Sequence, residues 1–134
     1  MRILVTGSRD WADEPTVWHA IDDAIHDLGA DHNGQVAIVH GACPTGADAI
    51  ADRIAIEGDC RPERHPANWS RGRKAGPERN AHMVSLGADI CLAFIGDCTS
   101  PRCNIEGKHP SHGASGCADL AERAGIPTRR FYAH

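Results

Sequence analysis

Aromatic residues and positive charge are both scarce in this 134-residue sequence. Phe, Trp and Tyr make up 4% of the chain, which is few for the stacked aromatic platforms that bind single-stranded nucleic acids. The formal net charge is −4, whereas a dedicated duplex-binding domain carries a basic surplus that neutralises phosphates. Both features count against a nucleic acid as the partner, so we expect any anion binding to be local.

Long apolar runs are also absent. No stretch approaches the roughly 20 apolar residues of a membrane-spanning helix, and the apolar run 2–6 is too short for the core of a signal peptide. We therefore expect a cytoplasmic protein without a membrane partner, in which the six cysteines stay mostly reduced. The length of 134 residues is that of one ordinary domain.

Short apolar runs alternate with helical patterns along the chain. Five runs are typical of strands, at residues 2–6, 35–40, 60–65, 89–95 and 126–132. Pro62 makes the third of them a weak or edge strand. Apolar spacing and capping residues predict helices over about 14–28, 46–57, 77–86 and 114–124. This order predicts a single Rossmann-like, three-layer α/β domain over residues 1–134, with a parallel sheet of about five strands.

Ligands of such folds bind beyond the carboxyl ends of the strands, so the turns that follow the strands are candidate sites. The first turn is TGSRDW, residues 6–11. Gly7 permits a close approach to a ligand, Ser8 offers a hydroxyl, and Arg9 is a cation suited to phosphate or carboxylate. The alternative is a plain strand-to-helix turn with a surface arginine.

The turn after the second strand, HGACPTGAD (40–48), has two glycines but lacks the lysine of a P-loop. Gly41 and Gly46 would let backbone N–H groups face a ligand, and the helix predicted from Gly46 adds unpaired N–H donors and its dipole. Such a turn can bind an anion without lysine. Thr45 and Asp48 fit a capping box, so the alternative is a well-capped helix with no ligand. Asp48 could also accept from a ribose hydroxyl.

The third turn, NWSRGRKAGPERN (68–80), concentrates positive charge. It contains Arg71, Arg73, Lys74 and Arg79 against one acid, Glu78. Because a helix is predicted to start near Pro77, the cations and the helix dipole would act together on an anion. Trp69 would either stack on a base of the ligand or pack against the protein itself. A solvated surface is the alternative.

Together, these three turns resemble the YspA-like branch of the SLOG superfamily, and the resemblance covers nearly the whole chain. It implies a Rossmann-like fold, a phage or bacterial source, a homodimer, and a pocket for a nucleotide or nucleotide-derived ligand. The superfamily also includes the LOG phosphoribohydrolases and the DprA/Smf proteins. By position, the implied ligand-binding residues are Gly7, Ser8, Arg9, Gly41, Ala42, Thr45, Gly46, Asp48, Trp69, Lys74, Ala75, Gly76, Arg79 and Asn80.

We expect a protein that senses or sequesters its ligand; the alternative is a LOG-like hydrolase that cleaves an N-glycosidic or phosphoribosyl bond. LOG enzymes carry a PGGxGTxxE motif whose glutamate is needed for cleavage. In this sequence the equivalent region is HPSHGASGCADL (109–120), which puts Cys117 at the position of that glutamate. Asp48 and Glu78 are then the candidate catalytic carboxylates.

A loop predicted at about 96–113 is rich in cysteine and histidine. The candidate ligands of a structural zinc are Cys98, Cys103, His109, His112 and Cys117. Their spacing does not match a zinc-finger pattern, so an insertion with incidental ligands is the alternative. Cys43, Cys60 and Cys91 are expected to be small packing residues.

Overall fold

The structure is a computed structural model that describes residues 1–29, 36–98 and 112–133. Its five strands form one parallel sheet in the order β3-β2-β1-β4-β5. They are β1 (Arg2–Gly7), β2 (Ala37–His40), β3 (Arg61–Arg64), β4 (Ile90–Ile95) and β5 (Thr128–Tyr132). The predicted Rossmann-like α/β fold is therefore confirmed.

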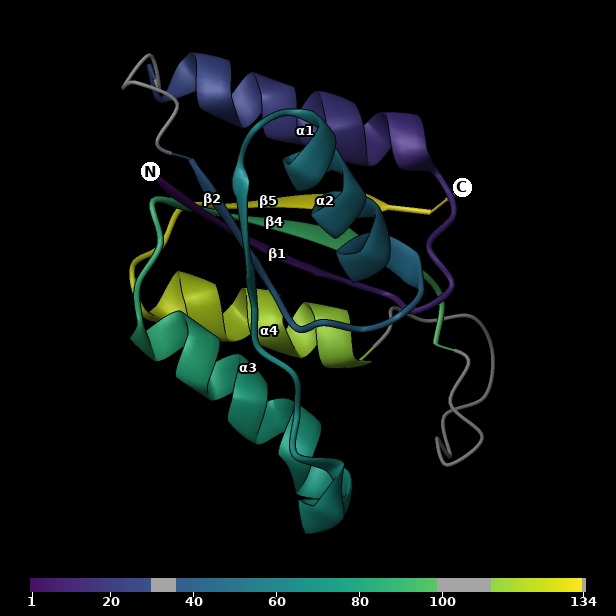
Figure 1. Cartoon of the computed structure of the whole chain (residues 1–134). Helices are drawn as coiled ribbons and strands as arrows, with labels where there is room; N and C mark the ends of the chain where they lie inside the picture. Colours follow the sequence, from purple (N-terminus) through teal and green to yellow (C-terminus); the bar gives the residue numbers. More distant parts are fainter. Residues whose placement is uncertain (30–35, 99–111, 134) are drawn as a thin grey trace.

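Helices cover both faces of the sheet, which gives three layers (Figure 1). One face carries α1 (Glu14–Asp27) and α2 (Gly46–Glu57), and the other carries α3 (Ala75–Ser85) and α4 (His112–Arg123). Alternate residues of β1 point to opposite faces, so Ile3 packs in the α1/α2 core and Leu4 in the α3/α4 core. Burial on both faces explains the almost continuous apolar runs in the sequence.

The first two helices begin where the sequence predicts, but only one of them is capped as predicted. Asp13 caps α1, because its carboxylate accepts from the Thr16 N–H at 3.2 Å. The expected capping box at α2 is wrong: no side-chain hydrogen bond from Thr45 caps this helix. The Asp48 carboxylate instead accepts from the Cys43 N–H, at 3.3 Å, and so stabilises the turn before the helix.

The third helix starts earlier than predicted. A 3-10 segment, η1 (Trp69–Lys74), occupies much of the expected loop and leads directly into α3 at Ala75. Gly72 interrupts η1 with φ 81° and ψ −152°, a backbone conformation that is essentially confined to glycine. The cations of the third turn are therefore presented by a short helical segment.

Most of the cysteine- and histidine-rich loop lies outside the described residues, including Cys103 and His109. Within residues 1–29, 36–98 and 112–133, no three His, Cys, Asp or Glu side chains form a group that could hold a metal ion. Cys117 is buried in the α3/α4 core, where burial raises its pKa. Structural zinc stays a prediction. None of the helices described is long and apolar enough to cross a membrane.

Candidate functional site

The turn after β1 is joined to two neighbouring elements through Ser8. Its N–H donates to the Phe94 carbonyl at 3.0 Å, and its hydroxyl oxygen accepts from the Gly96 N–H at 2.7 Å. Its carbonyl accepts from the Ala47 N–H at the start of α2, at 3.3 Å. Ser8 therefore fixes the ends of β1 and β4 relative to α2. Its side chain is buried, so it supports the turn from inside the protein.

Two glycines allow α2 to start directly against this turn. A Cβ atom on Gly7 would lie 2.3 Å from the Ala47 Cβ. A Cβ atom on Gly46 would lie 2.2 Å from the Ser8 carbonyl oxygen, and Gly46 also has φ +72°. Both distances are far shorter than a van der Waals contact. Gly7 and Gly46 therefore allow α2 to lie close to β1 and to the turn that follows it.

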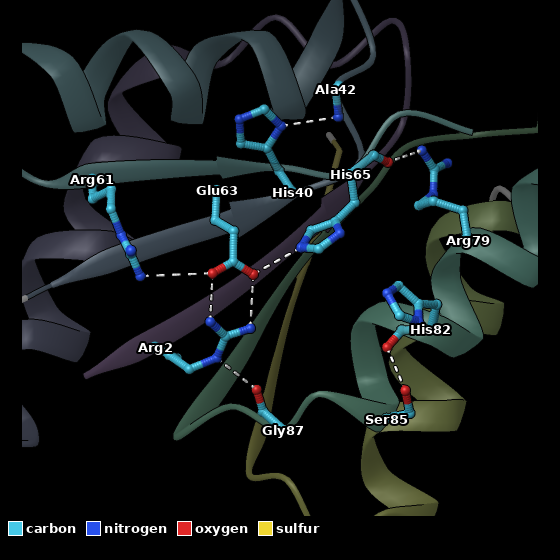
Figure 2. Close-up of polar contacts among 10 residues, drawn as sticks. All are labelled: Arg2, His40, Ala42, Arg61, Glu63, His65, Arg79, His82, Ser85 and Gly87. Atoms are coloured by element: carbon cyan, nitrogen blue, oxygen red, sulfur yellow. Dashed lines mark hydrogen bonds and ion pairs between the residues drawn. The ribbon is translucent and has the colours of Figure 1, made fainter. Parts of the chain in front are cut away.

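A buried histidine holds the turn after β2 in place. His40, whose side chain is 2% exposed, accepts from the Ala42 N–H at Nδ1 (3.0 Å), and its Nε2 lies 2.7 Å from the Asp52 carboxylate. Arg64 donates to both oxygens of Asp52 and, with His40, lowers the pKa of that carboxyl. Ala42 has φ 58°, a left-handed conformation that this hydrogen bond favours. Figure 2 shows the contact between His40 and Ala42.

Asp48 lies beneath the same turn and is 6% exposed. Burial raises the pKa of its carboxyl, while His40, the backbone N–H groups of Cys43 and Gly41, and Arg79 offset part of that rise. Because the turn's own amides bind this carboxylate, they are not directed at a ligand. Asp48 is therefore placed to shape the second turn.

Arg79 connects the ends of β2 and β3 to α3. Its Nη1 donates to the carbonyl of His65 (Figure 2) and to that of Gly41, and its Nε donates to the Asn80 side chain at 2.7 Å. A Cβ atom on Gly41 would lie 2.4 Å from Nη1, so glycine is what lets the guanidinium reach this carbonyl. Glu78, the other carboxylate named above, is exposed and paired with Arg71 at 2.8 Å, which lowers its pKa.

The first and third turns meet at Trp69. The Arg9 guanidinium lies 5.7 Å from the centre of the Trp69 ring, a distance typical of a cation–π contact. The opposite end of the indole faces Gly76, where a Cβ atom would lie 3.5 Å from the ring. Trp69 is 56% exposed, and Arg9 and Lys74 are exposed as well. The structure thus brings all three turns together and leaves an aromatic face and cations open to solvent.

A cavity of about 310 Å³ lies beside the third turn. Its lining residues are Arg64, His65, Pro66, Asn68, Arg71, Ala75, Glu78, Arg79 and His82. Sequence reasoning missed His65 and His82, as it missed the His40–Asp52 pair. Their positions at the carboxyl ends of strands could have pointed to two of these histidines, since His40 ends β2 and His65 directly follows β3.

Comparison with known proteins agrees with the arrangement of the turns. Residues 1–72 match the family described as "YAcAr: YspA, cpYpsA-related SLOG family". The chain is also 43% identical over 137 residues to the "Gene 61 protein" of Mycobacterium phage D29, over 97% of this chain and 95% of that protein. No solved structure matches. The chain belongs to the YspA, cpYpsA-related SLOG family, as its three turns predict.

Proposed function

We propose that this protein binds a nucleotide or nucleotide-derived ligand, and so senses or sequesters it, where the three turns meet. The observation that carries the proposal is the pairing of Arg9 with Trp69 across two turns that are far apart in sequence. An arginine beside an exposed indole offers a partner for phosphate and a face for a base. Family membership supports a nucleotide-related ligand.

We divide the predicted ligand-binding residues into two groups by their exposure and their hydrogen bonds. Arg9, Thr45, Trp69 and Lys74 are exposed and available to a ligand. Ser8, Asp48, Arg79 and Asn80 form hydrogen bonds within the protein, and we assign them to supporting the turns. Because no hydrogen bond from a side chain caps α2, the Thr45 hydroxyl and the positive end of the helix dipole suit a phosphate.

Binding without turnover fits the two carboxylates better than hydrolysis does. Cleavage of an N-glycosidic bond needs a carboxylate positioned at the anomeric carbon. Asp48 is enclosed beneath the second turn, and Glu78 is held by Arg71 on the surface. Asp48 is therefore not open to a sugar, and Glu78 would have to leave Arg71 to act on one.

A thermal-shift panel of nucleoside monophosphates, ADP-ribose, NAD and cyclic nucleotides tests the proposal. A ligand that binds should raise the melting temperature, and calorimetry with that ligand should give an affinity about tenfold lower for Trp69→Ala. Trp18→Ala is the matched control, because Trp18 is similarly exposed (51%) but lies on α1. Mass spectrometry should recover the ligand intact. A panel in which no compound raises the melting temperature would refute the proposal.

A further inference from the structure

His65, directly after β3, is held in one orientation by its neighbours. Its backbone N–H donates to the His40 carbonyl at 2.9 Å, and its Nε2 lies 2.7 Å from the Glu63 carboxylate. Glu63 is itself fixed by both terminal nitrogens of Arg2, at 2.6 and 2.9 Å (Figure 2). The ring of His65 packs edge-on against that of His82, with centroids 5.7 Å apart. This arrangement leaves Nε2–H as the donor to Glu63.

The second ring nitrogen of His65, Nδ1, has no hydrogen-bond partner within the part of the chain that the structure describes. In that part, every fully buried side-chain nitrogen or oxygen has a partner. Nδ1 is therefore in contact with solvent, and His65 lines the 310 Å³ cavity described above. His82 lines the same cavity and packs against His65.

Arginines line this cavity. Arg71 and Arg79 line it against one acid, Glu78; Arg64 lines it as well, but its guanidinium is bound by Asp52 on α2. Arg71 pairs with Glu78 in an exposed ion pair, and such pairs contribute little, so Arg71 can exchange Glu78 for another anion at small cost. Arg79 is anchored through Nε and Nη1, and among the described residues its Nη2 has no partner.

We propose that this cavity is a second anion site, for a tetrahedral dianion such as the phosphate group of a small phosphomonoester, and that binding is coupled to proton uptake by His65. Neutral His65 presents only a lone pair at Nδ1, which repels an anion. Protonated His65 donates from Nδ1 and keeps its hydrogen bond to Glu63 through Nε2. A cavity of 310 Å³ is at the small end of ligand pockets, which suits a small anion.

The charged groups around His65 determine the direction of the pH dependence. Glu63 and His82 contact its ring, Arg79 donates to its carbonyl, Arg2 binds Glu63, and Arg64, Arg71 and Glu78 line the same cavity. Glu63 accepts the hydrogen bond from Nε2, while Arg71 and Arg79 favour the anion. Because the bound anion stabilises the proton on His65, anion affinity rises as pH falls. This site does not depend on the proposed nucleotide site at Arg9 and Trp69.

Sulfate is the probe, because it stays dianionic throughout and any pH dependence then belongs to the protein. NMR titrations at constant ionic strength should show sulfate affinity rising about tenfold from about pH 8 to about pH 6. His65→Gln keeps an amide donor for Glu63 but lacks the second ring nitrogen, so it should weaken binding and remove the pH dependence. His19→Gln on α1, where His19 packs against Trp18, should behave like the wild type.

Imidazole ¹⁵N shifts of the wild-type protein test the coupling without any variant. Sulfate should move His65 Nδ1 toward its protonated shift at constant pH. The proposal is overturned if these shifts do not move, or if His65→Gln keeps the pH dependence. Ribose 5-phosphate that binds more tightly than sulfate identifies a phosphomonoester as the occupant, and equal binding identifies a free inorganic anion. A failed nucleotide panel leaves this result unaffected.

Discussion

His40 and His65 lie at the ends of neighbouring strands, and each is 2.7 Å from a carboxylate, yet their surroundings differ. His40 is 2% exposed, and both of its ring nitrogens are bonded within the protein. His65 is 19% exposed and faces a cavity with one nitrogen open. The comparison teaches that a carboxylate-bound histidine whose two nitrogens are both used has a structural role, whereas one with a nitrogen left open is available to a ligand.

The same contrast extends to the segments around the two histidines. The turn after β2 is enclosed, with Asp48 beneath it and Gly46 pressed against the first turn. The η1 segment has no buried residue and carries its cations on the surface. We therefore expect substitutions in the β2 turn to change stability, and substitutions around η1 to change ligand binding.

The largest effect is expected at Gly46. Gly46→Ala places a methyl group 2.2 Å from the Ser8 carbonyl oxygen and strains a positive φ, so it should lower the free energy of unfolding by about 3 kcal/mol or more. Gly125→Ala is the control, because Gly125 also has positive φ (+84°) but open space around it. That variant should cost about 1 kcal/mol. Urea unfolding measures both; equal losses would mean that the helix–turn contact is unimportant.

His40 comes next. His40→Leu leaves the Ala42 N–H without its acceptor and removes one of the two partners of the Asp52 carboxylate, which keeps Arg64, so it should lower the free energy of unfolding by about 2 kcal/mol. His40→Asn places an amide oxygen near the position of Nδ1 and should recover part of that loss. His65→Gln should change stability by less than about 1 kcal/mol. The contrast between the histidines is lost if Leu and Asn at position 40 are equally destabilising, or if His65→Gln costs as much.

Acid should weaken the fold through Glu63. Arg2 and then His65 hold the pKa of this carboxyl at about 2, below its ordinary value. A carboxyl whose pKa is lower in the folded state stabilises the protein above its unfolded pKa, and that contribution disappears as pH falls from about 5 toward 2. Urea midpoints measured over this range should fall less steeply for Glu63→Gln than for the wild type. Glu57→Gln, an exposed site on α2, should follow the wild type.

The smallest effect on stability is expected at Arg71. This side chain is exposed and its ion pair with Glu78 is surface-screened, so Arg71→Gln should change the free energy of unfolding by less than about 0.5 kcal/mol. The same variant should weaken sulfate binding at the cavity. A loss of stability above about 1 kcal/mol would show that η1 is part of the folded framework, contrary to the comparison above.

The alternation of strands and helices along the chain and the position of each turn could be predicted from the sequence, because they depend on local patterns. Apolar runs buried on both faces, Pro62 at an edge and the alternation with helices are sufficient for the fold. The convergence of the three turns follows from the parallel sheet. The capping box failed because Asp48 binds the amide of Cys43 instead, and Thr45 makes no capping hydrogen bond.

The sequence could not predict which residues of the site support the turns and which are exposed to a ligand. Arg79 and Arg9 are both cations in the turns, but only the structure shows that Arg79 is bound by two carbonyls while Arg9 lies over Trp69. His65 does not belong to a recognisable sequence motif. Its partner Glu63 lies on β3 and its partner His82 on α3, and only packing brings the rings of the two histidines together. Contacts of this kind depend on side-chain direction, which sequence spacing does not specify.

The two edge strands of the sheet, among the described residues, restrict how one copy of the protein can meet another. At one edge, β3 is built from Arg61, Pro62, Glu63 and Arg64. Pro62 has no N–H with which to extend a ladder, and at the other edge β5 carries Arg129 and Arg130. Strand-to-strand docking would bring arginines of two copies together, so fibre-like stacking is discouraged. Contacts between copies are therefore disfavoured at these two strands.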